Sequence, residues 1–254
     1  MVRRGSTGYL TTMAAQPQAS EDEPYQWTPE GVLGVIRDTV LLPEYPCLGA
    51  RSVVRTGRVT VGLFDDLGSS DSARELVPQL TEFARSVDLT AGFASFMAAF
   101  RGPVIHSERH FERLLWRELQ LIHDHDDHAW NHGVSVDPSS DRFGFSVGGR
   151  AFFVIGMHNH ASRIARRTPF PIMVFNLHEQ FEMLRRVGRF DPMRDVIRRR
   201  DLRLQGDLNP MVDDHGRSSE ARQYSGREVG DGWVPDFHPR LDALVHGAEK
   251  EEQE

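Results

Sequence analysis

Residues 143–157 read FGFSVGGRAFFVIGM. The pair Gly148-Gly149 separates two apolar segments, and a two-residue hairpin turn favours glycine because its backbone needs positive φ angles. The stretch therefore predicts a β-hairpin with strands at 143–147 and 151–157.

Further strands and separate helices are predicted on both sides of this hairpin. Two more strands are expected at 93–100 and 172–175, and a second hairpin is expected from 51–54 and 59–64 around Thr56-Gly57. The expected helices cover 29–41, 71–87 with a break or restart at Pro78, 107–123, 177–187 and 192–204. Hairpins mixed with separated helices indicate an α+β fold, in which one domain holds a mixed or antiparallel sheet with hairpins and flanking helices.

Capping signals set the ends of these helices. Thr28-Pro29-Glu30 combines an N-cap residue, proline at the first helical position and an acid in the first turn. Ser107 followed by Glu108 starts the predicted helix at 107–123. Gly188 ends the predicted helix at 177–187, and Asp191-Pro192 starts the one at 192–204.

The chain of 254 residues is long enough to bury a substantial core. Residues 1–24 are predicted to be a flexible leader, 25–240 the folded domain, and 241–254 an acidic tail. No apolar run approaches the roughly 20 residues that span a bilayer, and no signal peptide is recognised, so a cytoplasmic protein without membrane contact is expected.

Charge and cysteine content exclude several classes of partner and site. A net charge of −7 argues against nucleic acid as the main partner, since phosphate binding needs a basic surface. The single cysteine, Cys47, excludes an internal disulfide and a cysteine-based zinc cluster. The sequence also lacks the dinucleotide fingerprint, the P-loop and the nucleophile elbow.

Histidines form two clusters. The first comprises His123, His125, His128 and His132, interspersed with Asp124, Asp126 and Asp127. It lacks the His-Glu-x-x-His spacing of a zinc protease and is interpreted as a solvated loop, with a metal site as the alternative. The second starts at His158 and continues into Arg163, Arg166 and Arg167. One imidazole beside several guanidinium groups suits haem, which takes an axial histidine and has carboxylates that arginine binds; a plain surface loop is the alternative.

Six separated motifs in residues 30–240 resemble the YqcI/YcgG family, in the family's order. They are YPC at 45–47, GGRAFFV at 148–154, MH at 157–158 with SR at 162–163 and ARR at 165–167, FNLHEQFE at 175–182, LQG at 204–206 with NPM at 209–211, and SEARQYSG at 219–226.

This resemblance implies an activity. Characterised members of the family are haem-dependent enzymes that N-hydroxylate guanidino groups, acting on L-arginine in D-cycloserine formation and on an enduracididine derivative in guanitoxin formation. The resemblance therefore implies a monooxygenase of specialised metabolism that uses haem b iron, O2, a guanidino amino acid and an external reductase supplied by NAD(P)H. A haem-binding protein without oxygenase turnover is the alternative.

The resemblance also assigns roles to residues. His158 is expected to bind the iron, with His178, His123 and Cys47 as alternatives, and Arg163, Arg166 and Arg167 are expected to bind the haem carboxylates. The remaining candidates are Glu179 and Glu220 as catalytic residues and Asn176 and Arg227 as substrate-binding residues. Glu179 could instead form surface ion pairs on its helix, and Asn176 could serve only as the N-cap of that helix.

Overall fold

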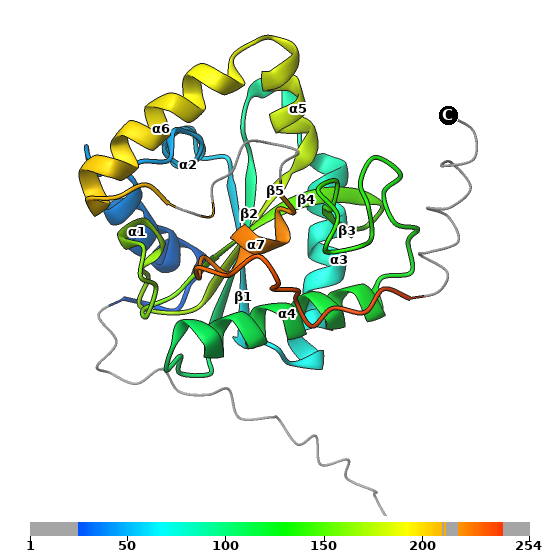
Figure 1. Ribbon diagram of the computed structural model, residues 1–254. Coiled ribbons are helices and arrows are strands. Elements are labelled where there is room, and N and C mark those ends of the chain that lie inside the picture. The colour runs from blue at the N-terminus through cyan, green and yellow to red at the C-terminus, as the bar shows by residue number, and fades with distance from the viewer. Residues whose placement is uncertain (1–24, 210, 212–217, 241–254) are drawn as a thin grey trace, which may run out of the picture.

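A five-stranded mixed sheet forms the centre of the protein, and helices cover both of its faces (Figure 1). The computed structural model describes residues 25–209, 211 and 218–240. Along the sheet the strands are β1 (Val59–Asp66), β2 (Ser95–Gly102), β5 (Ile172–Leu177), β4 (Arg150–Met157) and β3 (Phe145–Val147). The helices of four or more residues are α1 (Pro29–Val40), α2 (Leu48–Arg55), α3 (Ser70–Ser86), α4 (Glu108–His125), α5 (His178–Arg186), α6 (Phe190–Gln205) and α7 (Ala221–Tyr224).

The sheet contains one parallel pair and three antiparallel pairs. β1 and β2 run parallel because α3 connects them as a crossover, and the pairs β2–β5, β5–β4 and β4–β3 are antiparallel. The predicted α+β class and mixed sheet are confirmed.

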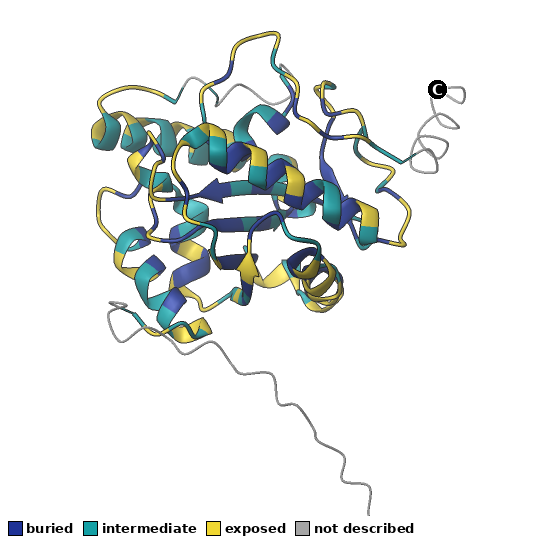
Figure 2. Ribbon diagram, turned by 90° about the horizontal axis from the view of Figure 1, so that it is seen from below, coloured by how far each residue is buried: buried dark blue, intermediate teal, exposed yellow. Residues whose placement is uncertain are grey.

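Alternate residues of the central strands pack into two separate apolar clusters. On β2, Phe96 and Phe100 face the cluster that includes α3 and α4, whereas Met97 and Ala99 face the cluster that includes α1. Figure 2 shows α4 lying across the sheet with exposed residues toward the viewer and mostly buried strands behind it. Both faces are therefore shielded from water.

The hairpin and the two best-capped helices form as predicted. Gly148 and Gly149 have φ angles of 61° and 73°, which is the conformation that the two-residue turn requires. Thr28 Oγ1 accepts a hydrogen bond from the backbone N–H of Gly31 at 3.1 Å, and Ser107 Oγ accepts one from His110 at 3.1 Å. These caps satisfy donors that the first helical turn leaves without partners.

The prediction of a second hairpin is wrong. Residues 51–54 belong to α2, whose start is capped by Cys47, and the strand that follows pairs in parallel with β2. The pair Val53-Val54 resembles a strand locally, but both side chains are buried on the inner side of a helix whose outward residues are polar. Tertiary burial thus outweighed the β propensity of two valines.

Pro78 does not divide α3, contrary to the prediction, because the helix runs through it. A proline inside a helix leaves the carbonyl group four residues earlier without its usual donor. Pro78 and Arg74 are both exposed, so water can hydrate that carbonyl group.

The last predicted helices differ only at their ends. α6 starts at Phe190 and ends at Gln205, and its C-cap, Gly206, has a left-handed backbone. The predicted leader, 1–24, and the acidic tail, 241–254, lie outside the described residues. In the part of the chain that the structure describes, no helix is long and apolar enough to cross a membrane.

Candidate functional site

The segment 219–227 covers an open edge of the sheet. β3 pairs with residues 150–152, and no other described residues add a strand to that side of β4. The hydroxyl of Tyr224, in α7, lies 3.2 Å from the backbone N of Phe145 and 3.3 Å from the carbonyl oxygen of Phe152. Arg166 extends this cover, donating hydrogen bonds to the carbonyl oxygens of Tyr224 (3.0 Å) and Gly156 (3.3 Å). An unpaired edge would otherwise expose backbone donors and acceptors.

Glu220 joins His178 and Tyr224 in a half-buried cluster. Its Oε1 lies 3.0 Å from His178 Nε2 and also accepts a hydrogen bond from the Tyr224 hydroxyl. Burial, reinforced by Glu220, raises the pKa of Tyr224 well above its ordinary value, so this hydroxyl keeps its proton. A Cβ at Gly144 would lie 2.7 Å from His178 Cε1, and glycine is therefore needed for the imidazole to approach the chain here.

His158 follows directly after β4 and is only 1% exposed. Its ring stacks on Phe111 with centroids 4.2 Å apart, and its Nδ1 accepts a hydrogen bond from the backbone N–H of His160 at 3.2 Å. Burial lowers the pKa of His158 to about 4, so the ring is neutral at pH 7. With Nδ1 accepting, the proton of the neutral ring lies on Nε2.

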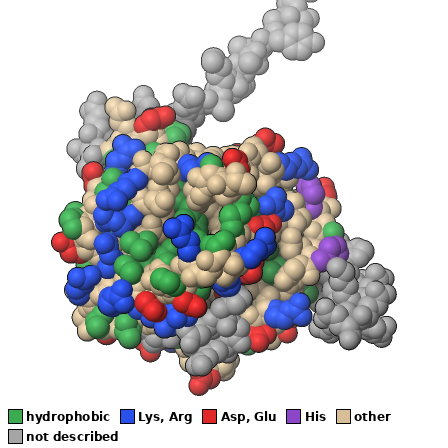
Figure 3. Space-filling model, turned by 90° about the horizontal axis from the view of Figure 1, so that it is seen from above, with side chains coloured by type: hydrophobic (Ala, Val, Ile, Leu, Met, Phe, Trp, Pro, Cys, Tyr) green, Lys and Arg blue, Asp and Glu red, His purple; other side chains and the backbone are tan. Residues whose placement is uncertain are grey.

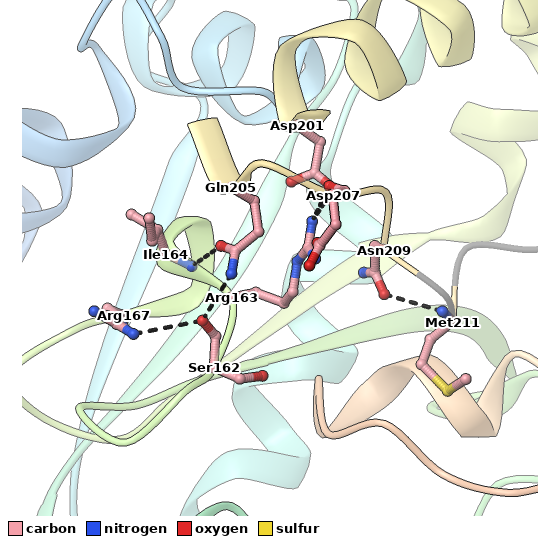
Figure 4. Close-up of polar contacts among 9 residues, drawn as sticks. All are labelled: Ser162, Arg163, Ile164, Arg167, Asp201, Gln205, Asp207, Asn209 and Met211. Carbon is pink, nitrogen blue, oxygen red and sulfur yellow. Dashed lines mark hydrogen bonds and ion pairs between the residues drawn. The ribbon is translucent and has the colours of Figure 1, made fainter. Parts of the chain in front are cut away.

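The three arginines of the 158–168 loop bind groups of the protein itself. Arg163 forms ion pairs with Asp201, at 2.5 Å, and with Asp207 (Figure 4). Arg167 donates to the carbonyl oxygen of Ala161 at 2.8 Å. Arg166 reaches the carbonyl oxygens at the β4 edge, and burial lowers its pKa to about 10.

The residues predicted to hold haem do not fit that group as they are placed. A neutral imidazole that binds iron through Nε2 carries its proton on Nδ1, whereas His158 Nδ1 accepts the backbone N–H of His160 here. Arg163 and Arg166 already hydrogen-bond protein acceptors and are not directed at a further anion. The cofactor-binding roles of these residues therefore remain predictions.

Two of the alternative iron ligands, Cys47 and His123, also hydrogen-bond within the protein. Cys47 Sγ accepts the backbone N–H of Ala50 at 3.4 Å, and burial raises the pKa of the thiol. His123 is buried, and its Nε2 accepts the backbone N–H of Arg240 at 3.0 Å. Among the described residues no group of three histidine, cysteine or acidic side chains is arranged to hold a metal ion, so the 123–132 cluster forms no such centre.

The predicted substrate residues lie apart from one another. Asn176 is on β5 and accepts a hydrogen bond from Ser95 at 2.6 Å, so it does not cap α5. Arg227 pairs with Glu112 at 2.6 Å, an acid of α4 that is buried beside the apolar stripe of that helix. An acidic residue on the apolar side of a predicted helix indicates a buried ion pair, and Glu112 was not identified on that ground.

Glu179 combines one satisfied oxygen with one unsatisfied oxygen. Its Oε1 accepts a hydrogen bond from Arg150 Nε at 2.7 Å, so it pairs with β4 and not along its own helix. Its Oε2 atom is covered and has no hydrogen-bond partner among the described residues, although the side chain as a whole is 40% exposed. Buried carboxylate oxygens are normally satisfied, so this atom has capacity for a further donor.

The candidate residues fall into two groups at opposite ends of β4. His178 follows Leu177, which pairs with Phe152 near the start of β4, whereas His158 follows its last residue. At about 3.4 Å per strand residue, the backbones of the two groups are on the order of 20 Å apart. Glu220 and His178 thus form one cluster and His158 with its arginine loop another.

Comparison with known proteins identifies one family and two curated relatives. The model of the YqcI/YcgG family matches residues 36–238. The chain is 26% identical over 145 residues to "Uncharacterized protein YcgG" of Bacillus subtilis (strain 168), which covers 55% of this chain and 57% of that protein. It is 23% identical over 146 residues to "Uncharacterized protein YqcI" of the same organism, covering 56% and 58%.

The chain thus spans less than two thirds of the length of these relatives, and no solved structure matches it. The family match, however, extends from α1 to beyond α7 and includes all five strands. The chain therefore belongs to the YqcI/YcgG family.

Proposed function

We propose that this protein is a haem-dependent monooxygenase that N-hydroxylates the guanidino group of L-arginine or a related guanidino amino acid, in specialised metabolism. Membership of the YqcI/YcgG family is the observation that carries the proposal. The contacts among the matched motifs add support, because segment 219–227 bonds both Arg166 and His178, which come from two other motifs.

The overall reaction defines what must be supplied from outside. One atom of O2 enters the new N–OH group and the other leaves as water, which requires two electrons and two protons for each guanidine oxidised. The sequence has no flavin or nicotinamide motif, so a separate reductase using NAD(P)H provides the electrons.

Two carboxylates are suited to a guanidinium substrate. Glu179 Oε2 is a buried acceptor without a donor, and a guanidinium N–H would satisfy it. Glu220 is held by His178 and Tyr224, and this carboxylate is the candidate for proton exchange with the reacting nitrogen. Because His158 and the arginine loop do not fit haem as placed, we assign no catalytic step to them.

Optical spectra of the protein expressed with a haem precursor test the cofactor. The proposal expects a Soret band, and the reduced CO form distinguishes the ligands, with a maximum at ~420 nm for an imidazole and ~450 nm for a thiolate. Separate His158→Ala, His178→Ala, His123→Ala and Cys47→Ser variants then identify the ligand as the one whose loss changes that spectrum. Purified protein with neither a Soret band nor haem iron would refute the proposal.

Turnover is tested with arginine, O2 and a reductase, with mass spectrometry of the product. N-hydroxyarginine or an N-hydroxylated relative is expected, and haem uptake without any product from a panel of guanidino amino acids would favour the haem-binding alternative. Glu179→Gln should raise KM at least tenfold, since a neutral amide attracts a guanidinium less. Glu182→Gln, at an exposed position of the same helix, is the matched control and should leave KM unchanged.

A further inference from the structure

β1 is the last strand at one end of the sheet. Among the described residues no strand pairs with it on the side opposite β2. The carbonyl oxygen of Arg58, just before β1, accepts the backbone N–H of Ser95 at 3.1 Å, so the backbone groups of every second residue from Arg58 onward point to β2. The backbone groups of the four residues in between point to the open edge; these residues are Val59, Val61, Leu63 and Asp65.

β1 lacks the features that usually keep the edge of a sheet from pairing. Its eight residues include neither proline nor lysine, and its register with β2 is constant along its length, without a bulge. Three apolar side chains on the face that α1 covers are only partly buried: Val59, Val61 and Leu63. The edge therefore offers both backbone groups without a strand partner and apolar surface, which main-chain pairing with another strand would use.

The sequence of β1 is complementary to itself about Gly62. In an antiparallel pair of two β1 strands with a two-fold axis at Gly62, Val61 of one copy lies opposite Leu63 of the other, and Val59 lies opposite Asp65. All four outward residues of each strand then face outward residues of the other. Opposite residues of this kind exchange two hydrogen bonds, so the pairing forms about eight.

The charged residues favour this register over its neighbours. With the axis at Gly62, Arg58 of each copy lies opposite Asp66 of the other, and opposite charges across two strands stabilise their pairing. A shift of the axis by one residue would separate Arg58 from Asp66. The Arg58 guanidinium donates to backbone carbonyl oxygens, among them that of Phe93 at 3.0 Å, and forms no ion pair with any residue that the structure describes. Its charge is therefore available to the carboxylate of a second copy.

The net charge of −7 does not oppose association of the folded part with itself. The described residues include 26 arginines against 27 aspartates and glutamates, so nearly all of the net charge belongs to segments outside them. Figure 3 shows basic and acidic side chains intermixed over one face of the molecule. Two copies of the folded part thus meet without strong electrostatic repulsion.

We propose that two copies of this chain pair through their β1 strands and join their sheets into one continuous sheet. A second copy is the occupant that the residues select, because it provides a partner for every outward residue and places Arg58 opposite Asp66 twice. The contact uses the same surface on both chains, so it closes at a dimer.

Sedimentation of the full chain at ~1 to ~100 µM tests the proposal. At the upper end, the wild type should have twice the chain mass of 28.8 kDa. Val61→Pro removes an N–H that points to the open edge and costs no hydrogen bond to β2, so this variant should be folded and monomeric throughout. Val61→Thr keeps that N–H and a β-branched side chain; it is the matched control and should stay dimeric.

A charge reversal tests the register. Asp66→Arg should weaken the dimer about tenfold, because it places a like charge opposite Arg58 at both ends of the pairing. Asp141→Arg makes the same change of charge at an exposed loop position and should leave the dissociation constant unchanged. Equal weakening by both variants would overturn the pairing about Gly62.

Hydrogen exchange of single amides in the wild type gives an answer even if Val61→Pro does not fold. In the dimer, the N–H groups of Val61 and Leu63 should be as protected as those of Gly62 and Phe64, which face β2. Dilution to the monomer should speed the exchange of Val61 and Leu63 at least tenfold and leave Gly62 and Phe64 protected. A wild type that is monomeric at every concentration, or a folded Val61→Pro variant that still dimerises, would overturn the proposal. Protection of Val61 and Leu63 in the monomer would also overturn it, since another part of the same chain would then cover the edge.

Discussion

Replacing Glu118 by glutamine should change how the stability of the protein depends on pH. Glu118 lies on α4, is fully buried, and accepts the backbone N–H of Gly68 through Oε2 at 2.7 Å. Its Oε1 has no hydrogen-bond partner among the described residues. Burial outweighs the opposing effect of the backbone N–H groups of Gly68 and Ser69 and raises the pKa of Glu118 from 4.5 to about 8, so the folded protein keeps this carboxyl group protonated at neutral pH.

The sign and size of the effect follow from the two pKa values. Below pH 4.5 the carboxyl group is protonated in both states, so it makes no difference to their balance. Between pH 4.5 and about 8 the unfolded chain releases the proton while the folded chain retains it, and rising pH therefore favours unfolding. At 1.36 kcal/mol for each pKa unit, the wild type should lose about 3 kcal/mol between pH 5 and pH 8 through this residue. Glutamine keeps the acceptor for Gly68 without titrating.

Urea denaturation followed by tryptophan fluorescence at pH 5, 6, 7 and 8 measures this difference. The free energy of unfolding of Glu118→Gln should gain about 3 kcal/mol relative to the wild type across that range. Glu75→Gln, at an exposed position of α3, should give no pH-dependent difference. A constant offset between Glu118→Gln and the wild type at all four pH values would refute the reasoning, since it would mean that Glu118 titrates alike in both states.

Two further substitutions test the loop around His158 and the cluster around Glu220. Arg163→Ala should lower the free energy of unfolding by about 3 kcal/mol, because it leaves Asp201 half-buried without its cation, and should expose α6 to proteolysis. Arg74→Ala, which removes an exposed ion pair with Asp71, should cost less than about 0.5 kcal/mol in the same urea titration; equal losses would contradict this view. Gly144→Ala should cost about 1–3 kcal/mol because its Cβ meets His178, whereas Gly34→Ala, with open space around it, should be neutral or stabilising in thermal unfolding.

Local sequence signals predicted correctly those elements that depend on neighbouring residues. The Gly148-Gly149 turn, the Thr28 cap and the Ser107 cap each depend on residues within a few positions, and all three form as expected. α2 was missed because its helical state depends on burying Val53 and Val54 against distant parts of the chain. The pairing of β1 with β2 was missed for the same reason, since α3 separates the two strands.

The candidate site was predictable as a set of residues but not as a set of contacts. His158 and Arg163 are close in sequence, and the structure keeps them in one loop. The carboxylates that engage Arg163 come from Asp201 and Asp207, about 40 positions later, and no local pattern indicates them. Sequence spacing can therefore propose which residues matter, but it cannot tell which of their hydrogen bonds the fold already uses.

The hydrogen bonds within the protein distinguish motif residues that stabilise the fold from motif residues whose polar groups are available to bind a substrate. Arg166 and Tyr224 close the edge of β4, and His178 holds Glu220, so their polar groups are engaged within the protein. At the start of α5, by contrast, Glu179 Oε2 is a buried acceptor and Gln180 Nε2 a buried donor, each without a partner among the described residues. Leaving such groups unsatisfied costs about 1–3 kcal/mol each, a cost that a bound ligand can remove. A guanidino amino acid carries both a cationic donor and an anionic acceptor, which is why Glu179 is the first residue of these motifs to test for substrate contact.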